Sequence, residues 1–370
     1  MIKIGHAGAI LSIDLKAIAK NYKLLKSLIT TSCECSAVVK SDAYGLGLAG
    51  IAKELAEAGC NSFFVAQIEE GVKLREILSP EFFGARIYLL NGLPSCTKGE
   101  LETHRLIPVL NSLEEIATWS DYAKSKNQKQ PAIINIDTGM SRLGLSPKEI
   151  TTLSRDHDCL NNLDIHYSMT HLACGDERGN PQNFEQKNRF DMFRNKLPLL
   201  KGCMANSAGI FLGSDYHYSM VRPGAAIYGI KPTQGEPNPM QPVVKLQGRI
   251  LQIRVIKKNT PVGYGTSYRA KKTTKIATVA VGYGDGFLRN LGNRGSGFIG
   301  NIRVPIVGRV SMDLTTFDVT NVPESLVKPG KMVDLICPLH TLDDLAEEAG
   351  TIGYEILTNL GSRYFRQYVH

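Results

Sequence analysis

The sequence predicts an α/β protein: an N-terminal (β/α)8 barrel of the TIM type followed by a mainly-β domain. Short apolar runs alternate with helical patterns over about 230 residues, which is near the usual length of such a barrel. Prolines then cluster at residues 232–242, and segments 243–256, 276–281 and 302–307 beyond them are rich in valine and isoleucine. We expect the barrel over residues 1–235 and the β domain over residues 236–370.

The barrel strands are expected where apolar, often β-branched residues run together. These runs lie at residues 37–40, 63–66, 86–90, 107–110, 132–136, 165–170, 202–205 and 220–222. Helices are expected between them, because Asp14 and Ser146 are good caps and Ser112 with Glu115 predicts a capping box. A doubly wound sheet would give the same local alternation, so this pattern alone leaves both architectures open.

Composition and charge narrow the class of protein. Hydrophobic content of 43% and charged content of 21% are typical of a soluble globular chain. No apolar run approaches the roughly 20 residues of a membrane span, and residues 1–11 do not resemble a signal peptide. The 8 cysteines lack metal-binding spacing, which favours free thiols and a cytoplasmic location. The net charge of +8 is dispersed, which favours small anionic ligands over nucleic acid.

The most informative segment is residues 37–47, AVVKSDAYGLG. It reads as a buried strand that ends on Lys40, followed by small residues, Tyr44 and two glycines. A lysine at the carboxyl end of a barrel strand points to the rim where such folds build their sites. Desolvation there lowers the pKa of an amine, and a neutral amine suits Schiff-base chemistry. A lysine whose ammonium reaches solvent from the strand end is the alternative.

Other polar residues follow later strands. Arg142, in the loop DTGMSRLG at 137–144, could bind a carboxylate or could be a surface arginine. His171 could face a ligand or could be a satisfied core residue. The segment ANSA at 205–208 is typical of an anion-binding helix start, or of an ordinary cap at Ser207.

Taken together, these segments resemble the alanine racemases, which are fold-type III enzymes that depend on pyridoxal phosphate. The resemblance begins with residues 37–47 and extends over most of the chain. The further matching segments, in order, are 137–144, 170–171, 205–208, 221–229, 263–268, 282–286, 307–313 and 353–357.

The resemblance implies a pyridoxal phosphate cofactor joined to Lys40 as a Schiff base. It implies that Arg222 hydrogen-bonds the pyridine nitrogen and that His171 packs on the ring. An arginine keeps that nitrogen unprotonated, which weakens the electron sink and favours racemisation over transamination. The remaining residues implied to bind the cofactor are Tyr44, Asn206, Ser207, Gly224, Ala225 and Tyr354.

The resemblance also implies two bases on opposite faces of the substrate. Lys40 acts on the D-face, and Tyr268 from a partner subunit acts on the L-face, so the protein is expected to be a homodimer with shared active sites. Register on the family motif, and not the sequence itself, selects Tyr268 over Tyr264. Arg142 and the backbone of Met312 are implied to bind the substrate carboxylate, and Tyr283 to lie at the entrance.

The chain departs from the family pattern at one position. Many members carry a carbamylated lysine that braces the arginine, and here Asn135 stands at that place. A neutral amide lacks the charge of a carbamate, so other residues, water or a bound anion must brace Arg142.

The function expected is interconversion of L- and D-alanine, a small amino-acid substrate, with D-alanine feeding peptidoglycan. A fold-type III decarboxylase is one alternative, but it would carry an acidic partner for the pyridine nitrogen and a cysteine near Tyr268. A non-enzymatic pyridoxal-phosphate-binding barrel is the other, but such proteins resemble the barrel alone. Neither a nucleic-acid partner, a membrane partner nor a metal is expected.

Overall fold

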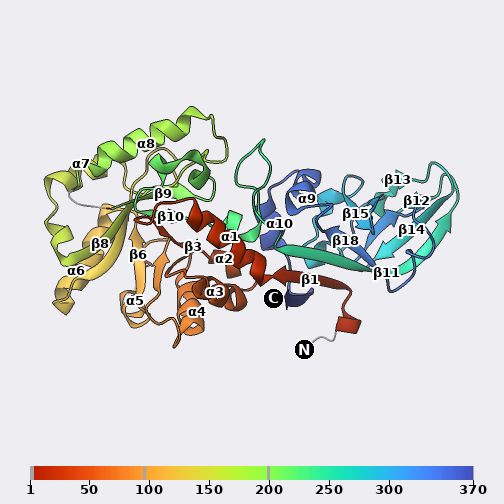
Figure 1. Ribbon diagram of the computed structural model, residues 1–370, viewed down its shortest axis with the longest axis horizontal. Coiled ribbons are helices and arrows are strands. Elements are labelled where there is room, and N and C mark those ends of the chain that lie inside the picture. The colour runs from red at the N-terminus through yellow and green to blue at the C-terminus, as the bar shows by residue number, and fades with distance from the viewer. Residues whose placement is uncertain (1–3, 95–96, 198–200, 370) are drawn as a thin grey trace.

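The structure is a computed structural model that describes residues 4–94, 97–197 and 201–369. Its two parts lie side by side, with the barrel at one end of the long axis and a sheet-rich domain at the other (Figure 1). Among the described residues, no helix is long and apolar enough to cross a membrane.

Nine parallel strands form the first sheet, in the order β2-β10-β9-β8-β7-β6-β5-β4-β3. Strands β2 and β3 are two pieces of one stretch interrupted at Ser36; β2 pairs with β10 and β3 with β4, so the sheet closes on itself. This closure confirms the expected barrel and excludes the open sheet. The strands are β2 (Glu34–Cys35), β3 (Ala37–Val38), β4 (Ser62–Val65), β5 (Arg86–Leu89), β6 (Leu106–Leu110), β7 (Gln130–Asn135), β8 (Leu163–Met169), β9 (Gly202–Asn206) and β10 (Met220–Arg222).

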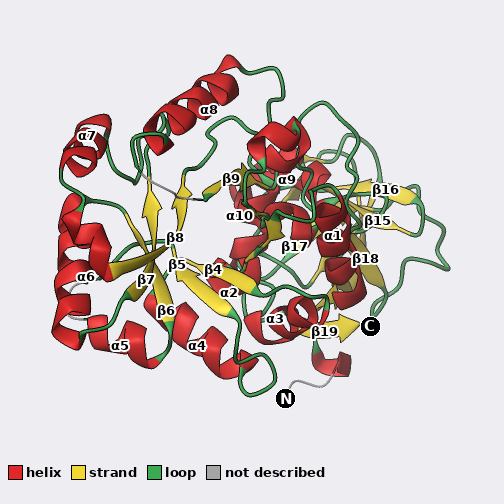
Figure 2. Cartoon of the chain, turned by 60° about the vertical axis from the view of Figure 1, so that its left-hand side comes forward, coloured by secondary structure: helices red, strands yellow, loops and turns green. Residues whose placement is uncertain are grey.

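Helices surround the strands on the outside of the barrel (Figure 2). They are α1 (Leu15–Ser27), α3 (Leu48–Glu57), α4 (Ile68–Leu78), α5 (Lys98–Thr103), α6 (Leu113–Lys126), α7 (Pro147–Arg155) and α8 (Pro181–Arg194). The caps expected at Asp14 and Ser146 are confirmed, because each side chain accepts a hydrogen bond from the first turn of its helix.

The capping box expected at Ser112 is only half formed. The Ser112 hydroxyl accepts from the amide of Glu115 at 3.2 Å, as expected. The Glu115 carboxylate, however, accepts from the amide of Asn111 at 2.6 Å and not from that of Ser112. Asn111 directly follows the end of β6, where its amide has left the strand ladder and needs another acceptor. The prediction of a reciprocal box was therefore wrong at this helix.

The second domain is built on an eight-stranded sheet. Its strands are β1 (Ala9–Asp14), β11 (Val244–Ile256), β14 (Thr274–Val279), β15 (Ser296–Ile299), β16 (Ile302–Pro305), β17 (Thr315–Asp318), β18 (Met332–Ile336) and β19 (Phe365–Val369). The short pair β12 (Pro261–Val262) and β13 (Tyr268–Arg269) stands apart from this sheet, and helices α9 (Leu342–Ala349) and α10 (Gly353–Asn359) complete the domain. The domain expected after the proline-rich segment is thus rich in strands.

Strand β1 links the two parts. It pairs antiparallel with β11 and parallel with β19, so residues 9–14 lie in the second sheet although they precede the barrel in the chain. The expected division at residue 235 assigns these residues to the first domain. Their alternate residues are buried, which suits a strand with one face against a core. The chain therefore starts in one domain, builds the other and returns.

Candidate active site

A cavity of about 690 Å³ opens at the carboxyl ends of the barrel strands. Its walls come from the loops after the strands and from α10 of the second domain. Ten residues expected to form the site from the sequence all line this cavity: Lys40, Tyr44, Arg142, His171, Asn206, Ser207, Arg222, Gly224, Ala225 and Tyr354. The fold thus brings together residues that are up to 314 positions apart in the chain (354 − 40).

The sequence predicts that Lys40 ends a strand, and this prediction was wrong. Strand β3 ends at Val38, and Lys40 begins the short turn α2 (Lys40–Tyr44), whose residues after Lys40 have left-handed backbone angles. The amine still lines the cavity at the carboxyl edge of the barrel. Its pKa is lowered from the usual 10.5, mainly by desolvation and further by the nearby Arg142 cation, while Glu70 opposes the shift. Desolvation and the Arg142 charge both favour the neutral, nucleophilic amine.

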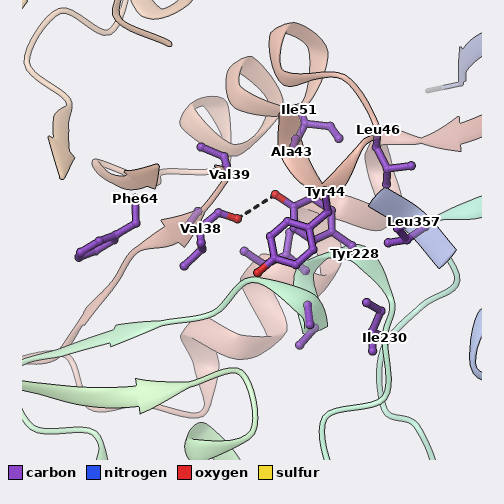
Figure 3. Packing of buried hydrophobic residues seen from close by; sticks show 14 of the residues in the cluster. Val38, Val39, Ala43, Tyr44, Leu46, Ile51, Phe64, Tyr228, Ile230 and Leu357 are labelled. Carbon is purple, nitrogen blue, oxygen red and sulfur yellow. Dashed lines mark hydrogen bonds between the residues drawn. The ribbon is translucent and has the colours of Figure 1, made fainter. Parts of the chain in front are cut away.

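Tyr44, at the end of the same turn, is fixed by aromatic packing (Figure 3). Its ring stacks on that of Tyr228 with centroids 4.6 Å apart, and the Tyr228 hydroxyl donates to the carbonyl of Val38 at 2.9 Å. The ring of Tyr354, from α10, lies 6.1 Å from that of Tyr44. Burial raises the pKa of Tyr44 above its usual value, with a further contribution from Tyr354, so both groups remain protonated donors at neutral pH.

The loop that carries Arg142 is organised by Asp137. One carboxylate oxygen of Asp137 accepts from the amides of Gly139, Met140 and Ser141 at 2.9, 3.1 and 3.0 Å. These bonds close a tight loop in which the Arg142 side chain reaches the cavity wall. The carboxylate charge is thus engaged by backbone donors rather than by the guanidinium.

Asn135 lies at the end of β7 and also lines the cavity. Its side-chain nitrogen donates to the side-chain oxygen of Asn111 at 2.8 Å in a buried contact. Within residues 4–94, 97–197 and 201–369, the structure shows no hydrogen bond from Asn135 to Arg142. The replacement of a lysine by asparagine therefore gives a neutral amide pair.

Arg222, the last residue of β10, is nearly inaccessible and is held by neutral acceptors. One terminal nitrogen donates to the carbonyl and the sulfur of Cys203 at 3.0 and 2.8 Å. The other donates to the carbonyl of Thr170 at 2.7 Å and lies 3.3 Å from Nδ1 of His171. No acceptor contacts its Nε among the described residues, so that donor is available to a ligand in the cavity.

The pKa of His171 responds to desolvation and to Arg222, Arg142 and Lys40, which all line the same cavity. Desolvation lowers its pKa to about 3, and Arg222, Arg142 and Lys40 each contribute. The imidazole is therefore neutral at physiological pH, and Nδ1 can accept the hydrogen bond from Arg222. This arrangement confirms the contact between His171 and an arginine that the resemblance implies.

The end of β9 and the loop after β10 bring Ser207, Gly224 and Ala225 together in the same cavity. The hydroxyl oxygen of Ser207 accepts from the amides of Gly224 and Ala226 at 3.0 and 3.1 Å, which leaves its proton free to donate to a ligand. A Cβ atom on Gly224 would lie 2.4 Å from the Tyr44 hydroxyl, so only glycine allows this close approach. The Ala225 amide adjoins this cluster.

Three expected residues do not line the cavity of their own chain: Tyr268, Tyr283 and Met312. Tyr268 lies in β13, and β12 and β13 are at the end of the second domain that is remote from the barrel (Figure 1). Tyr283 and Met312 are 43% and 54% exposed. Burial and Asp318 raise the pKa of Tyr268 in its own chain.

The sequence did not identify several residues that support the site. Gln186 on α8 donates to Thr138 and to the carbonyl of His171, which ties together the loops after β7 and β8. Tyr228 supports Tyr44, and Glu70 contacts the turn after Lys40. Tyr228 lies within the matching segment 221–229. Glu70 and Gln186 are polar residues on helices, and such residues are so common on protein surfaces that nothing in the sequence marks these two.

The residues present fit a phosphorylated aldehyde of the pyridoxal phosphate type. Ser207 and the adjoining small residues suit a phosphate, the free Nε of Arg222 suits a ring nitrogen, and the amine of Lys40 suits the aldehyde carbon. A reactive lysine in a cationic cavity at the carboxyl end of a (β/α)8 barrel, beside a strand-rich second domain, defines the class of two-domain barrel proteins with Schiff-base chemistry.

Comparisons with known proteins identify the family. Models described as the N-terminal and C-terminal domains of alanine racemase match residues 13–232 and 243–368. An alanine racemase of Rhodospirillum rubrum is 46% identical over 99% of this chain and 98% of its own. A catabolic alanine racemase of Mesorhizobium japonicum is 45% identical over 98% of this chain and 94% of its own. The chain belongs to the alanine racemase family.

A solved structure supports the same assignment. The crystal structure of alanine racemase from Bartonella henselae with covalently bound pyridoxal phosphate has a TM-score of 0.94 and 41% identity, covering 98% of this chain and 100% of its own. The biosynthetic alanine racemase of Pseudomonas aeruginosa has a TM-score of 0.88 and 29% identity, covering 98% of this chain and 100% of its own.

Proposed function

We propose that this protein is a pyridoxal-phosphate-dependent alanine racemase that interconverts L- and D-alanine. The observation that carries the proposal is the convergence of Lys40, Arg142 and Arg222 on one cavity that is also lined by Ser207. Family membership and a relative with covalently bound pyridoxal phosphate support the same activity.

Each cavity residue then has a definite role toward the cofactor. Lys40 would hold it covalently, and Arg222 would donate from Nε to its ring nitrogen. Ser207 and the Ala225 amide would bind its phosphate with Tyr44, Asn206 and Tyr354, while the Gly224 amide holds Ser207 in place. When bound, pyridoxal phosphate supplies an electron-withdrawing ring that makes the Cα proton of an attached amino acid acidic. Arg142 would bind the substrate carboxylate, since its guanidinium is not engaged by Asp137.

Racemisation requires a proton donor on one face of Cα and an acceptor on the other. In the L-to-D direction, the phenolate of Tyr268 removes the Cα proton and the Lys40 ammonium returns one on the opposite face. In the reverse direction Lys40 would accept and Tyr268 would donate. For successive turnovers in one direction, the proton gained by one residue must return to the other through solvent before the next turnover. The lowered pKa of Lys40 suits this exchange, because desolvation makes its ammonium a stronger acid than an ordinary lysine.

The second base implies a homodimer. Tyr268 is remote from the barrel of its own chain, so Tyr268 and the Met312 amide would reach the cavity from a partner subunit, with Tyr283 of that subunit at the entrance. A two-fold dimer makes two such sites. We further propose a cytoplasmic location, domain boundaries near residue 235 with β1 added to the second domain, and a role in supplying D-alanine for peptidoglycan.

The test is a chiral amino-acid assay with L-Ala, D-Ala, L-Ser and L-Lys, with and without added pyridoxal phosphate. We expect fastest interconversion for alanine and a requirement for the cofactor. Borohydride reduction of the loaded protein, followed by peptide mapping, should place the cofactor on the peptide that contains Lys40. Release of an amine and carbon dioxide would identify a decarboxylase instead, and a cofactor-loaded protein that converts none of the four would refute the enzymatic proposal.

A further inference from the structure

The backbone that follows Lys40 is held in a conformation that L-residues avoid. Ser41, Asp42, Ala43 and Tyr44 have φ values of 55°, 54°, 54° and 56°. Left-handed geometry is unfavourable for each residue other than glycine, and the cost is met four times in succession here. The internal bonds of the turn, such as that from the amide of Gly45 to the carbonyl of Ser41 at 2.7 Å, offset only part of this cost. Surrounding groups must therefore hold the turn.

On one side, the second domain contacts the end of the turn. A Cβ atom on Gly45 would lie 2.5 Å from the carbonyl oxygen of Leu357 in α10, and the Tyr368 hydroxyl donates to the carbonyl of Leu46 at 2.8 Å. Leu357 and Leu46 lie close to each other beside Tyr44 (Figure 3). These contacts hold the residues after Tyr44, and they leave the start of the turn to be fixed from elsewhere.

On the other side, Glu70 fixes the start of the turn. One carboxylate oxygen accepts from the amide of Ser41 at 2.5 Å, and the other accepts from the amides of Ala66 and Gln67 at 2.8 and 3.1 Å. Ala66 and Gln67 precede α4, so the carboxylate also caps that helix and is held there by its dipole. Glu70 thus joins a rigid helix start to the first left-handed residue, directly beside Lys40.

We propose that Glu70 is the positioning residue that sets the direction of Lys40 by clamping the Ser41 amide. The inference rests on the proposed function in one respect, which is that Lys40 is the residue that bonds the cofactor. Because the clamp acts on the peptide adjacent to Lys40, its loss frees the turn to relax toward right-handed geometry and moves the amine relative to Arg142 and Ser207. A carboxylate is suited to this task, since it offers acceptors to three amides at once.

Two variants separate this role from ordinary helix capping. Glu70→Ala removes the clamp and the cap together, and Glu70→Gln keeps the shape but places a donor group against one set of amides. Asp344→Ala is the matched control, because the Asp344 carboxylate accepts from the Thr341 amide at 2.7 Å in the same capping role at the start of α9. Asp344 has no part in the turn.

The primary measurement is amide hydrogen exchange in the cofactor-free protein, read on a peptide that covers residues 37–47. We expect exchange to be faster by about tenfold or more in both Glu70 variants and unchanged in Asp344→Ala. The second measurement is the rate at which the cofactor-free protein captures pyridoxal phosphate on Lys40, followed by absorbance and borohydride trapping. We expect this rate, and kcat more than KM for alanine, to fall with Glu70→Ala and to recover in part with Glu70→Gln.

The exchange result decides the inference independently of activity. Unchanged protection of residues 37–47 in the Glu70 variants would overturn it, and so would an equal effect of Asp344→Ala on that peptide or on cofactor capture. If the unaltered protein captured no pyridoxal phosphate, the proposed function would fail, but the exchange measurement would still show whether Glu70 holds the turn. Should Glu70→Ala not fold, Glu70→Gln carries both measurements.

Discussion

Two variants that are each inactive should restore activity when their subunits are mixed. The residues that line the cavity all fall between positions 38 and 225 or between positions 352 and 358 of one chain. None of the described residues between these two ranges lines it. Tyr268, in that interval, can therefore reach a cavity only in a second copy. In the proposed homodimer, Lys40→Ala and Tyr268→Ala each remove one base from every site, so both variants should be nearly inactive.

A mixed dimer gathers both defects in one site and leaves the other site intact. Random exchange between equal amounts makes about half of the dimers mixed, and each has one complete site of two, so roughly a quarter of all sites should be active. The assay is racemisation of L-alanine after co-expression or co-refolding, with differently tagged subunits so that mixed dimers can be isolated and counted. The isolated mixed dimer should reach about half of the activity of the unaltered protein.

Tyr264 provides the matched control, since it is 71% exposed and lies four residues before Tyr268 in the same motif. The Tyr264→Ala variant should be active by itself. Mixing it with Lys40→Ala therefore measures only the loss of activity that follows when active subunits are mixed with inactive ones. If isolated mixed dimers of Lys40→Ala and Tyr268→Ala show no activity, both residues act within one chain and the shared-site reasoning is refuted.

Three further outcomes are expected. The pKa of His171 falls from 6.5 to about 3 on folding, so below about pH 6.5 the unfolded chain gains a proton that the folded chain does not. The free energy of unfolding therefore falls with pH, by about 2 kcal/mol at pH 5. In urea unfolding of the cofactor-free protein, His171→Gln should lose less of this free energy between about pH 8 and pH 5 than the unaltered protein does. Asn135 cannot be carbamylated, so added bicarbonate should leave the rate of alanine racemisation unchanged. Asn135→Ala leaves the buried side-chain oxygen of Asn111 without its donor, so it should lower the free energy of unfolding by about 1–3 kcal/mol. Ser207→Ala removes the acceptor of two buried amides and a phosphate donor, so the dissociation constant for pyridoxal phosphate, measured by fluorescence titration, should rise about tenfold; an unchanged constant would contradict the phosphate role.

The sequence predicts the parallel strands and their carboxyl edge well because both depend on local patterns, although these patterns alone leave an open sheet possible. Apolar runs define the strands, and a residue at the carboxyl end of a parallel strand lies at the same rim as its counterparts on the other strands. For this reason Arg142, His171 and Arg222 could be placed near Lys40 without knowledge of the exact backbone. The family resemblance then assigned their roles, which composition and spacing do not reveal.

The left-handed turn could not be predicted, because no local preference favours it. Ser41, Asp42 and Ala43 are ordinary helix, turn or strand residues, and a strand continuing to Lys40 is the natural interpretation of the preceding valines. What fixes the turn is a carboxylate 29 residues away and a helix of the other domain. The position of β1 was missed for a similar reason, since its partners β11 and β19 lie more than 200 residues later.

These long-range contacts also explain how the cavity keeps its positive charge. Asp137 and Glu70 shape the loops that carry Arg142 and Lys40, but one oxygen of Asp137 and both oxygens of Glu70 accept from backbone amides. Arg222 is held by carbonyls and a sulfur, which carry no formal charge. In the part of the chain that the structure describes, the loops are thus held rigidly without a carboxylate pairing directly with either arginine. Arg142 and Arg222 therefore keep their charge available to attract the phosphate of a cofactor and the carboxylate of a substrate. A carboxylate paired directly with any of them would fix its geometry equally well but would weaken its attraction for both anions.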